Sequence, residues 1–407
     1  MKKTVLREYA KLIAKAGANV QKGQEVFITA ELDQPEFVAM VVDECYKLKA
    51  KKVVVDWSYQ PLTKLHVRYR SVKTLSTLDN YEEARWQHYV DTIPCRIYLI
   101  SEDPDGLRGV NQEKMAKSQQ AKYPIIKGYR DQIENKYQWC IAAVPGEKWA
   151  KKLFPELRAS QAVEKLWEAI LKTSRVTGDP IKAWEDHNRD LHDRCEYLNK
   201  LHIRELRYKS SNGTDFTVGM IPEAQFCGGG ETSLQGIFFN PNIPTEECFI
   251  SPMRGVAEGI VYATKPLSYQ GQLISGFWIR FHEGKAVEWH AEENNELLTK
   301  LIEMDEGSRY LGECALVPFD SPINQTGLLF YNTLFDENAC CHLALGMGFA
   351  DTIRDFRNKT LDECRKLGVN DSMIHEDFMI GSADLSIDAV CEDGKTVAIF
   401  RNGTWAF

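Results

Sequence analysis

The first half of the chain alternates between short continuous apolar runs and segments whose apolar residues recur every three or four positions. We expect buried strands in four runs: 25–30 (EVFITA), 51–58 (KKVVVDWS), 95–102 (CRIYLISE) and 138–146 (QWCIAAVPG). Helices with one apolar face are expected at about 5–16 and at 36–50. Buried strands alternating with amphipathic helices are typical of a parallel sheet covered on both faces. The pattern therefore predicts an α/β N-terminal domain with a largely parallel sheet.

The second half of the chain is richer in strands. The segment 203–220 reads as two strands around Asn212-Gly213, a dipeptide that favours a tight hairpin turn. More strands with glycine-bearing turns follow in 259–291, and a helix is expected in 293–304. The pattern changes from alternating helices and strands to mainly strands near residues 180–200. We therefore predict two domains, residues 1–190 as the α/β domain and residues 191–407 as a strand-rich α+β domain.

Length, charge and cysteine content restrict the class of protein. The 407 residues exceed one simple core, and no stretch is long and apolar enough to cross a bilayer. The start of the chain has charges between its apolar residues and does not resemble a signal peptide, so we expect a cytoplasmic protein without a membrane partner. The net charge of −8 and the lack of a basic cluster argue against nucleic acid as a partner. Eleven cysteines without a Cys-x-x-Cys pair indicate reduced, mostly buried thiols.

Acidic residues and histidines recur beside strand-like apolar runs at four places in the second half. These places contain Glu246 and Glu247, then Glu313, then His342, and finally His375 with Asp377. A lone glutamate flanked by apolar residues is costly to bury as an anion, so it must be protonated, paired or bound to a cation. Imidazole and carboxylate groups together suit divalent cations.

The residues alone leave a structural interpretation open beside the metal site. A single histidine is more often a structural residue than a ligand, Glu247 could be a charge at a strand edge, and His375 could cap a turn. The strongest indication is the spacing of His375 and Asp377, because side chains two apart in a strand point to the same face. On that geometry Glu376 points to the opposite face.

The motifs PTEE…SPMR, LGE, ENACCHLALGMG and HEDFMIGS, in this order and spacing, resemble those of the M29 metallo-aminopeptidases, the aminopeptidase T/S group. The resemblance extends over nearly the whole chain. It implies a metal-dependent hydrolase that releases N-terminal amino acids from peptides, with two divalent ions (zinc, cobalt or manganese) in the C-terminal domain. It also implies a homodimer. The ligands carried over by this resemblance are Glu247, Glu313, His342, His375 and Asp377.

The same resemblance assigns further roles. Either Glu313 or Glu247 is expected to move the proton to the leaving amine. Arg254 is expected to hold a substrate carboxylate or to orient a ligand, although a plain surface arginine is equally compatible with the sequence. The family usually has a tyrosine seven residues after the histidine that corresponds to His342. This chain has Phe349 at that position. A phenylalanine cannot donate the hydrogen bond that a tyrosine hydroxyl would offer to a developing oxyanion.

Two other functions compete with the aminopeptidase hypothesis. The first alternative is a dioxygenase that cleaves dihydroxypyridine rings with a single non-haem iron, an enzyme whose fold resembles the one expected here. In such an enzyme His342, His375 and Asp377 would form the facial triad that holds the iron. The presence of both Glu247 and Glu313 favours two metal ions instead. The third hypothesis is a catalytically weakened metal-binding relative, because Phe349 lacks the hydroxyl.

Overall fold

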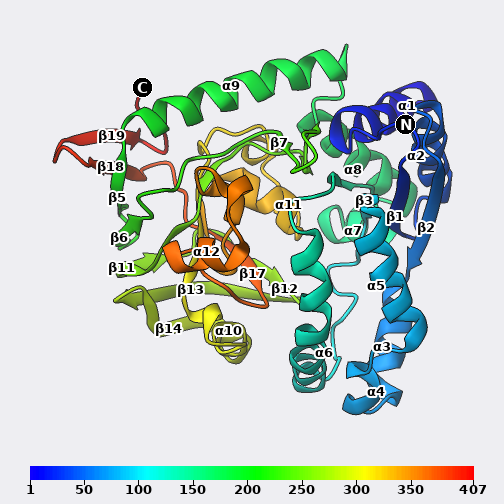
Figure 1. The fold of residues 1–407 in the computed structure, drawn as a ribbon, viewed down its shortest axis with the longest axis horizontal. Helices are drawn as coiled ribbons and strands as arrows, with labels where there is room; N and C mark the ends of the chain where they lie inside the picture. The colour runs from blue at the N-terminus through cyan, green and yellow to red at the C-terminus, as the bar shows by residue number, and fades with distance from the viewer. The chain divides into compact units, whose positions relative to one another are not determined.

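A computed structural model describes residues 1–407 (Figure 1). The chain forms two compact units, the first made of Met1–His187 and Gly230–Pro244, the second of Asn188–Gly229 and Thr245–Phe407. The domains expected from the sequence, residues 1–190 and 191–407, stay a prediction, and a single boundary does not describe the return of residues 230–244 to the first unit. None of the helices combines the length and apolar character needed to cross a membrane.

The first unit is built on a five-stranded parallel sheet with the order β2-β1-β3-β4-β9. Its strands are β1 (Glu25–Glu31), β2 (Lys52–Ser58), β3 (Cys95–Ile100), β4 (Trp139–Ala143) and β9 (Asn242–Ile243). The first four correspond to the four apolar runs, so the predicted parallel sheet is confirmed. The return segment contributes the two-residue edge strand β9 to this sheet.

Eight helices lie entirely within this unit. They are α1 (Lys3–Leu12, continued by a π-helical turn, Ile13–Gly17), α2 (Pro35–Lys47), α3 (Gln60–Tyr69), α4 (Val72–Ser76), α5 (Asn80–Thr92), α6 (Gln112–Ile133), α7 (Glu147–Leu153) and α8 (Ala159–Thr173).

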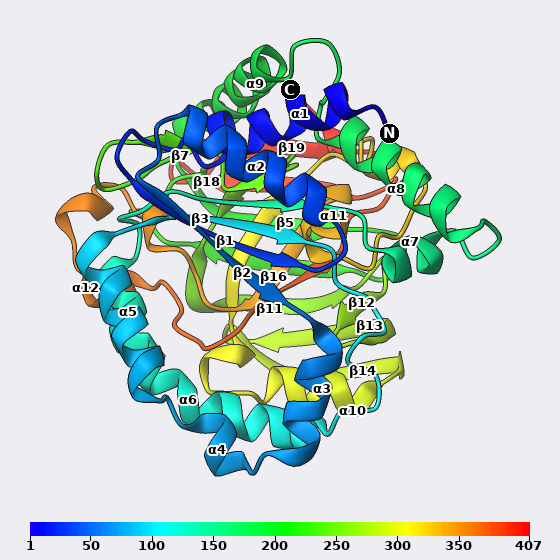
Figure 2. The same ribbon diagram turned by 90° about the vertical axis from the view of Figure 1, so that its right-hand side faces the viewer.

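Aromatic side chains attach these helices to the unit. Helices α1 and α2 lie side by side (Figure 2), with the rings of Tyr9 and Phe37 stacked at 5.5 Å. On the face that carries Phe27 of β1, Tyr89 of α5 packs edge-on at 5.0 Å. The opposite face, which carries Cys140 of β4, meets the turn at Gly17, where a Cβ atom would lie 2.6 Å from the sulfur of Cys140. Glycine is therefore required at that position.

Helix α9 (Pro180–Lys200) carries the chain into the second unit, which contains a large, mainly antiparallel sheet. The strands of this sheet are β5 (Ile203–Lys209), β6 (Asp215–Met220), β11 (Pro252–Tyr262), β12 (Leu267–Tyr269), β13 (Gln272–His282), β14 (Lys285–Glu293), β18 (Ser386–Cys391), β19 (Thr396–Arg401) and β20 (Thr404–Trp405). Strands β5 and β6 pair antiparallel around the expected turn, where Gly213 has a φ of +103°. Helix α10 (Asn295–Ile302) forms within the segment predicted as helical.

A smaller antiparallel sheet of four strands, in the order β10-β15-β16-β17, completes the second unit. Its strands are β10 (Cys248–Ile250), β15 (Leu311–Leu316), β16 (His342–Gly346) and β17 (His375–Met379). Every residue of β15 and β16 is buried, so this sheet lies inside the unit. Two short helices, α11 (Thr333–Asp336) and α12 (Leu361–Leu367), lie in its connections, and a separate hairpin of β7 (Glu231–Thr232) and β8 (Phe238–Phe239) belongs to the first unit.

Candidate metal centre

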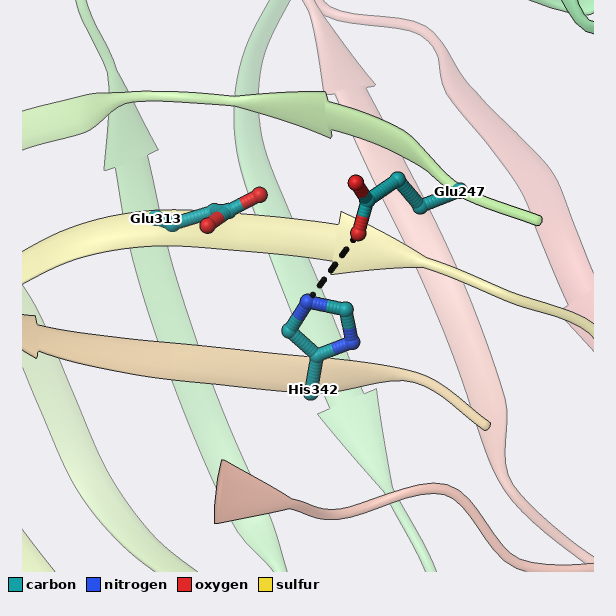
Figure 3. A group of neighbouring side chains, drawn as sticks. All are labelled: Glu247, Glu313 and His342. Carbon is teal, nitrogen blue, oxygen red and sulfur yellow. Dashed lines mark ion pairs between the residues drawn. The ribbon is translucent and has the colours of Figure 1, made fainter. Parts of the chain in front are cut away.

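The four-stranded sheet brings together the acidic residues and histidines singled out in the sequence. At least one of them lies in each strand or directly before it. Glu247 directly precedes β10, Glu313 lies in β15, His342 begins β16, and His375 and Asp377 lie in β17. Neighbouring strands of this sheet are separated by long connections in the sequence. Side chains from four distant segments therefore meet only because the sheet places their strands next to one another. Figure 3 shows three of these side chains, those of Glu247, Glu313 and His342.

The strand register turns these side chains to one face. Glu313 lies opposite Ala344, and Ala344 lies opposite Asp377. Residues directly opposite one another in an antiparallel pair project from the same face. His342 precedes Ala344 by two residues and His375 precedes Asp377 by two, so both imidazoles share the face of Glu313. Glu376 lies opposite Leu345 and projects from the other face, as the sequence predicted.

A β-bulge in β15 sets the direction of Glu313. Leu311 lies opposite Leu345, yet Glu313, two residues later, lies opposite Ala344, so the register shifts at Gly312. The extra residue lets Leu311 enter the hydrophobic core while Glu313 turns to the other face. A Cβ atom at Gly312 would lie 2.1 Å from the carbonyl oxygen of Met347, so the bulge requires glycine.

The ligand atoms form two groups that share Glu313. One contains Glu247, Glu313 and His342, the other Glu313, His375 and Asp377, and within each group the candidate ligand atoms lie within 4.8 Å of one another. In the first group, His342 Nε2 lies 3.3 Å from Glu247 Oε2 (Figure 3). In the second, His375 Nε2 lies 3.0 Å from Glu313 Oε2 and 3.3 Å from Asp377 Oδ1.

Backbone carbonyls orient both imidazoles. The Nδ1 atom of His375 lies 2.7 Å from the oxygen of Met347, and that of His342 lies 3.4 Å from the oxygen of Cys340. An Nδ1–H that donates to a carbonyl leaves Nε2 as the nitrogen with a free lone pair. Both Nε2 atoms face the carboxylates, which is the arrangement that metal-ligating histidines adopt in proteins.

Burial gives the cluster unusual proton affinities. Glu313 is 4% exposed and His342 is 1% exposed. Burial raises the pKa of Glu313 to about 7, against the opposing effect of its hydrogen bond with His375. Burial alone would lower the pKa of His342, but the hydrogen bond with Glu247 and the charge of Asp377 outweigh it and raise this pKa to about 9.

These residues fit a divalent metal. The Oδ1 atom of Asp377 is buried and accepts no hydrogen bond, although buried carboxylate oxygens are normally satisfied. Three carboxylates and two imidazoles in two groups are donors that zinc, cobalt and manganese accept. The nearest nitrogen atoms are Nε2 of His375 at 3.3 Å and Nε2 of His342 at 3.9 Å, and a cation held between these atoms and Asp377 would satisfy the oxygen.

One further acidic residue of the cluster, Glu337, was not singled out in the sequence. It starts the 3-10 turn Glu337–Ala339, and its carboxyl group hydrogen-bonds with Asp377. Burial, then the negative charges of Asp377 and Glu247, hold the pKa of Glu337 well above its usual range. Asn338 donates a hydrogen bond of 3.2 Å to Glu337 Oε1. A turn has no residue periodicity, so only its place five residues before His342 could have signalled this group.

The structure places Phe349 at the cluster and Arg254 away from it. The ring of Phe349 lies 4.7 Å from the imidazole of His375. Arg254 is exposed, and its guanidinium lies 4.5 Å from the centre of the Tyr310 ring, with no ion pair to a carboxylate of the cluster. We therefore retain Phe349 as a site residue, while the contacts of Arg254 favour the surface interpretation.

Metal affinity should depend steeply on pH. Ligands bind metal in their deprotonated forms, and the raised pKa values of Glu313 and His342 mean that protons occupy these groups near neutrality. We expect the apparent affinity for Zn²⁺ to rise about tenfold per pH unit for each proton released, between pH 6 and pH 8. Isothermal titration in buffers of different ionisation enthalpy would count those protons. A pH-independent affinity without proton release would contradict this prediction.

The chain is similar to known proteins along nearly its whole length. The sequence profile of the family described as thermophilic metalloprotease (M29) matches residues 2–405. Aminopeptidase AmpS of Bacillus subtilis (strain 168) is 39% identical over 404 residues, covering 99% of this chain and 98% of its own. Aminopeptidase T of Thermus aquaticus is 36% identical over 405 residues, covering 98% of each.

Two solved structures resemble this chain. Wild-type AmpT from Thermus thermophilus has a TM-score of 0.89 and 36% identity, with 100% of both chains covered. The 2,5-dihydroxypyridine dioxygenase from Pseudomonas putida KT2440 has a TM-score of 0.53 and 12% identity, with 99% of this chain and 96% of the other covered. At that identity the second likeness concerns the fold alone.

Proposed function

The chain belongs to the M29 family of thermophilic metalloproteases, and from this premise we propose that it is a dinuclear metal-dependent aminopeptidase that releases N-terminal amino acids from peptides. The observation that carries the proposal is that Glu313 belongs to both groups of candidate metal ligands. One carboxylate common to two ligand groups is the arrangement expected of a residue that bridges two ions. A single ion held by His342, His375 and Asp377 would not use the buried carboxylates of Glu247 and Glu313 as ligands.

The residues divide between the two ions. Glu247 and His342 would hold one ion, His375 and Asp377 the other, and Glu313 both. A bound pair of divalent ions supplies Lewis-acid activation of the scissile carbonyl and lowers the pKa of a water molecule. Zinc, cobalt and manganese all suit these donors.

The chain itself supplies orientation and proton transfer. The carbonyls behind His342 and His375 fix the direction of both Nε2 atoms. The free α-amino group of a peptide would bind one of the ions or a carboxylate of the cluster, and this requirement would restrict cleavage to the N-terminal residue. A carboxyl group must carry a proton to the leaving amine. Glu247 and Glu313 were expected in this role from the sequence, and the structure adds Glu337 as a third carboxyl group in the same cluster.

We also propose a cytoplasmic homodimer. All eleven cysteines are free thiols, which suits a reducing compartment. Six large apolar side chains between residues 57 and 81 of the first unit are at least 45% exposed, and such surfaces commonly mediate association: Trp57, Tyr59, Leu62, Leu65, Tyr69 and Tyr81. Light scattering on the purified protein would measure the mass of the assembly.

Metal analysis combined with an activity assay tests the function. We expect close to two divalent ions per chain after loading with zinc, cobalt or manganese, and release of the N-terminal residue from leucine 4-nitroanilide and short peptides. N-acetylated peptides should resist cleavage, because they lack the free amine. A single iron per chain with oxygen consumption would favour the dioxygenase, whose triad would be His342, His375 and Asp377.

A further inference from the structure

The ligand cluster is open to solvent mainly at His375. The side chain of His375 is 24% exposed, while those of Glu247, Glu313, His342 and Asp377 are at most 10% exposed. A substrate that reaches the cluster within this unit must therefore approach beside His375. The groups that surround this imidazole determine which side chains can lie there.

Two phenylalanine rings flank that opening. Phe349 lies 4.7 Å from His375, and Phe249 lies 5.7 Å from Phe349 with the two rings nearly perpendicular at 77°. Phe249 is opposite Ala315 in the strand register, and Ala315 is opposite His342, so Phe249 projects from the face that carries the ligands. Both rings are only partly buried.

Phe349 is held in this place by its backbone. Its N–H donates to the hydroxyl of Ser251 at 2.7 Å, and Ser251 is fully buried. Two residues earlier, the oxygen of Met347 receives the hydrogen bond of His375. The same loop thus fixes the imidazole and the neighbouring ring, so the aromatic surface keeps a constant position relative to the metal ligands.

We propose that Phe249 and Phe349 form the apolar wall that receives the side chain of the substrate's N-terminal residue, and thereby select large apolar residues such as leucine and phenylalanine. The inference rests on the proposed aminopeptidase function. The two rings contact each other, and Phe349 also contacts the ligand His375, so the surface that they offer is mainly aromatic. Transfer of an apolar side chain from water onto such a surface is favourable. The two residues are assigned to specificity, with no part in bond cleavage.

The test is the ratio of kcat/KM for the leucine and alanine 4-nitroanilides, measured with the fully metal-loaded protein. In Phe249→Ser this ratio should fall about tenfold, which is the usual range for lost contacts in an apolar pocket. Phe249→Leu should keep the ratio within about threefold of the wild-type value, because an apolar side chain remains. Phe356→Ser is the matched control, since this partly buried phenylalanine lies in the 3-10 turn Phe356–Asn358.

A ratio is insensitive to a loss of folded protein, because both substrates report on the same active fraction. If Phe249→Ser lowers kcat/KM equally for the two anilides, the ratio stays unchanged. That result would overturn the proposal that Phe249 is part of the apolar wall. So would a fall of the same size in Phe356→Ser. A wild-type protein that binds metal but hydrolyses no anilide would overturn the proposed function and this inference together, whereas a constant ratio in an active enzyme would overturn the inference alone.

Discussion

Replacement of Glu313 by glutamine is expected to lower kcat/KM for leucine 4-nitroanilide by at least about a thousandfold, more than the roughly 10- to 100-fold usual for groups that only orient a ligand. Glu313 is the one residue common to both ligand groups. A glutamine oxygen carries no charge and cannot bridge two cations as a carboxylate does. The bound metal should fall from about two ions per chain towards one or none, as elemental analysis would show.

The same substitution should not destabilise the fold when a chelator is present. Burial raises the pKa of Glu313 to about 7, so the folded protein disfavours the ionised form relative to the unfolded chain. Above that pH the charge therefore costs stability, and glutamine removes the cost. We expect the Tm of Glu313→Gln at pH 8 to equal or exceed that of the wild type.

A matched control separates the role of Glu313 as a metal ligand from the effect of losing any one carboxylate. Glu288 lies on β14, where it pairs with the exposed Arg280 at 3.0 Å. Glu288→Gln should retain full metal content and activity, because exposed ion pairs contribute little. A Glu313→Gln protein that keeps two ions and most of its activity would contradict the bridging assignment.

The sequence was sufficient to predict single strands of the protein and the faces of their side chains, but not how the strands of this site come together. Period-two spacing was enough to place His375 and Asp377 on one face and Glu376 on the other, because that property is local to β17. The four apolar runs of the first half likewise became the parallel strands β1 to β4. In both cases the information lies within a few residues of the chain.

The convergence of the ligands depends on contacts that no local pattern encodes. The order β10-β15-β16-β17 follows from packing of the whole unit, so the shared position of Glu313 is visible only in the structure. Glu337 lies in a turn without periodicity, and Phe249 resembles any apolar strand residue. The resemblance to a family suggested the ligand set, while the bulge at Gly312 that aims Glu313 appears only in the strand register.

A tyrosine at position 349, which the resemblance to the M29 family implies, should raise activity. In Phe349→Tyr we expect kcat to increase by on the order of a hundredfold, the effect typical of one added donor to a developing oxyanion. The ring of Phe349 already lies 4.7 Å from the imidazole of His375, so we expect a hydroxyl on that ring to lie near the ligands. KM should change little, because the apolar surface of the ring is retained. Steady-state kinetics at saturating metal would measure both constants.

The neighbouring ring provides the control for this substitution. Phe249→Tyr adds the same hydroxyl to the neighbouring ring, whose centre lies 5.7 Å from that of Phe349, so a general effect of polarity would appear in both variants. A gain confined to Phe349→Tyr would identify a position-specific donor and would mean that the wild-type protein works without it. If kcat stayed constant or fell in Phe349→Tyr, another group of this chain must already stabilise the oxyanion, and the hypothesis of a catalytically weakened relative would lose its basis.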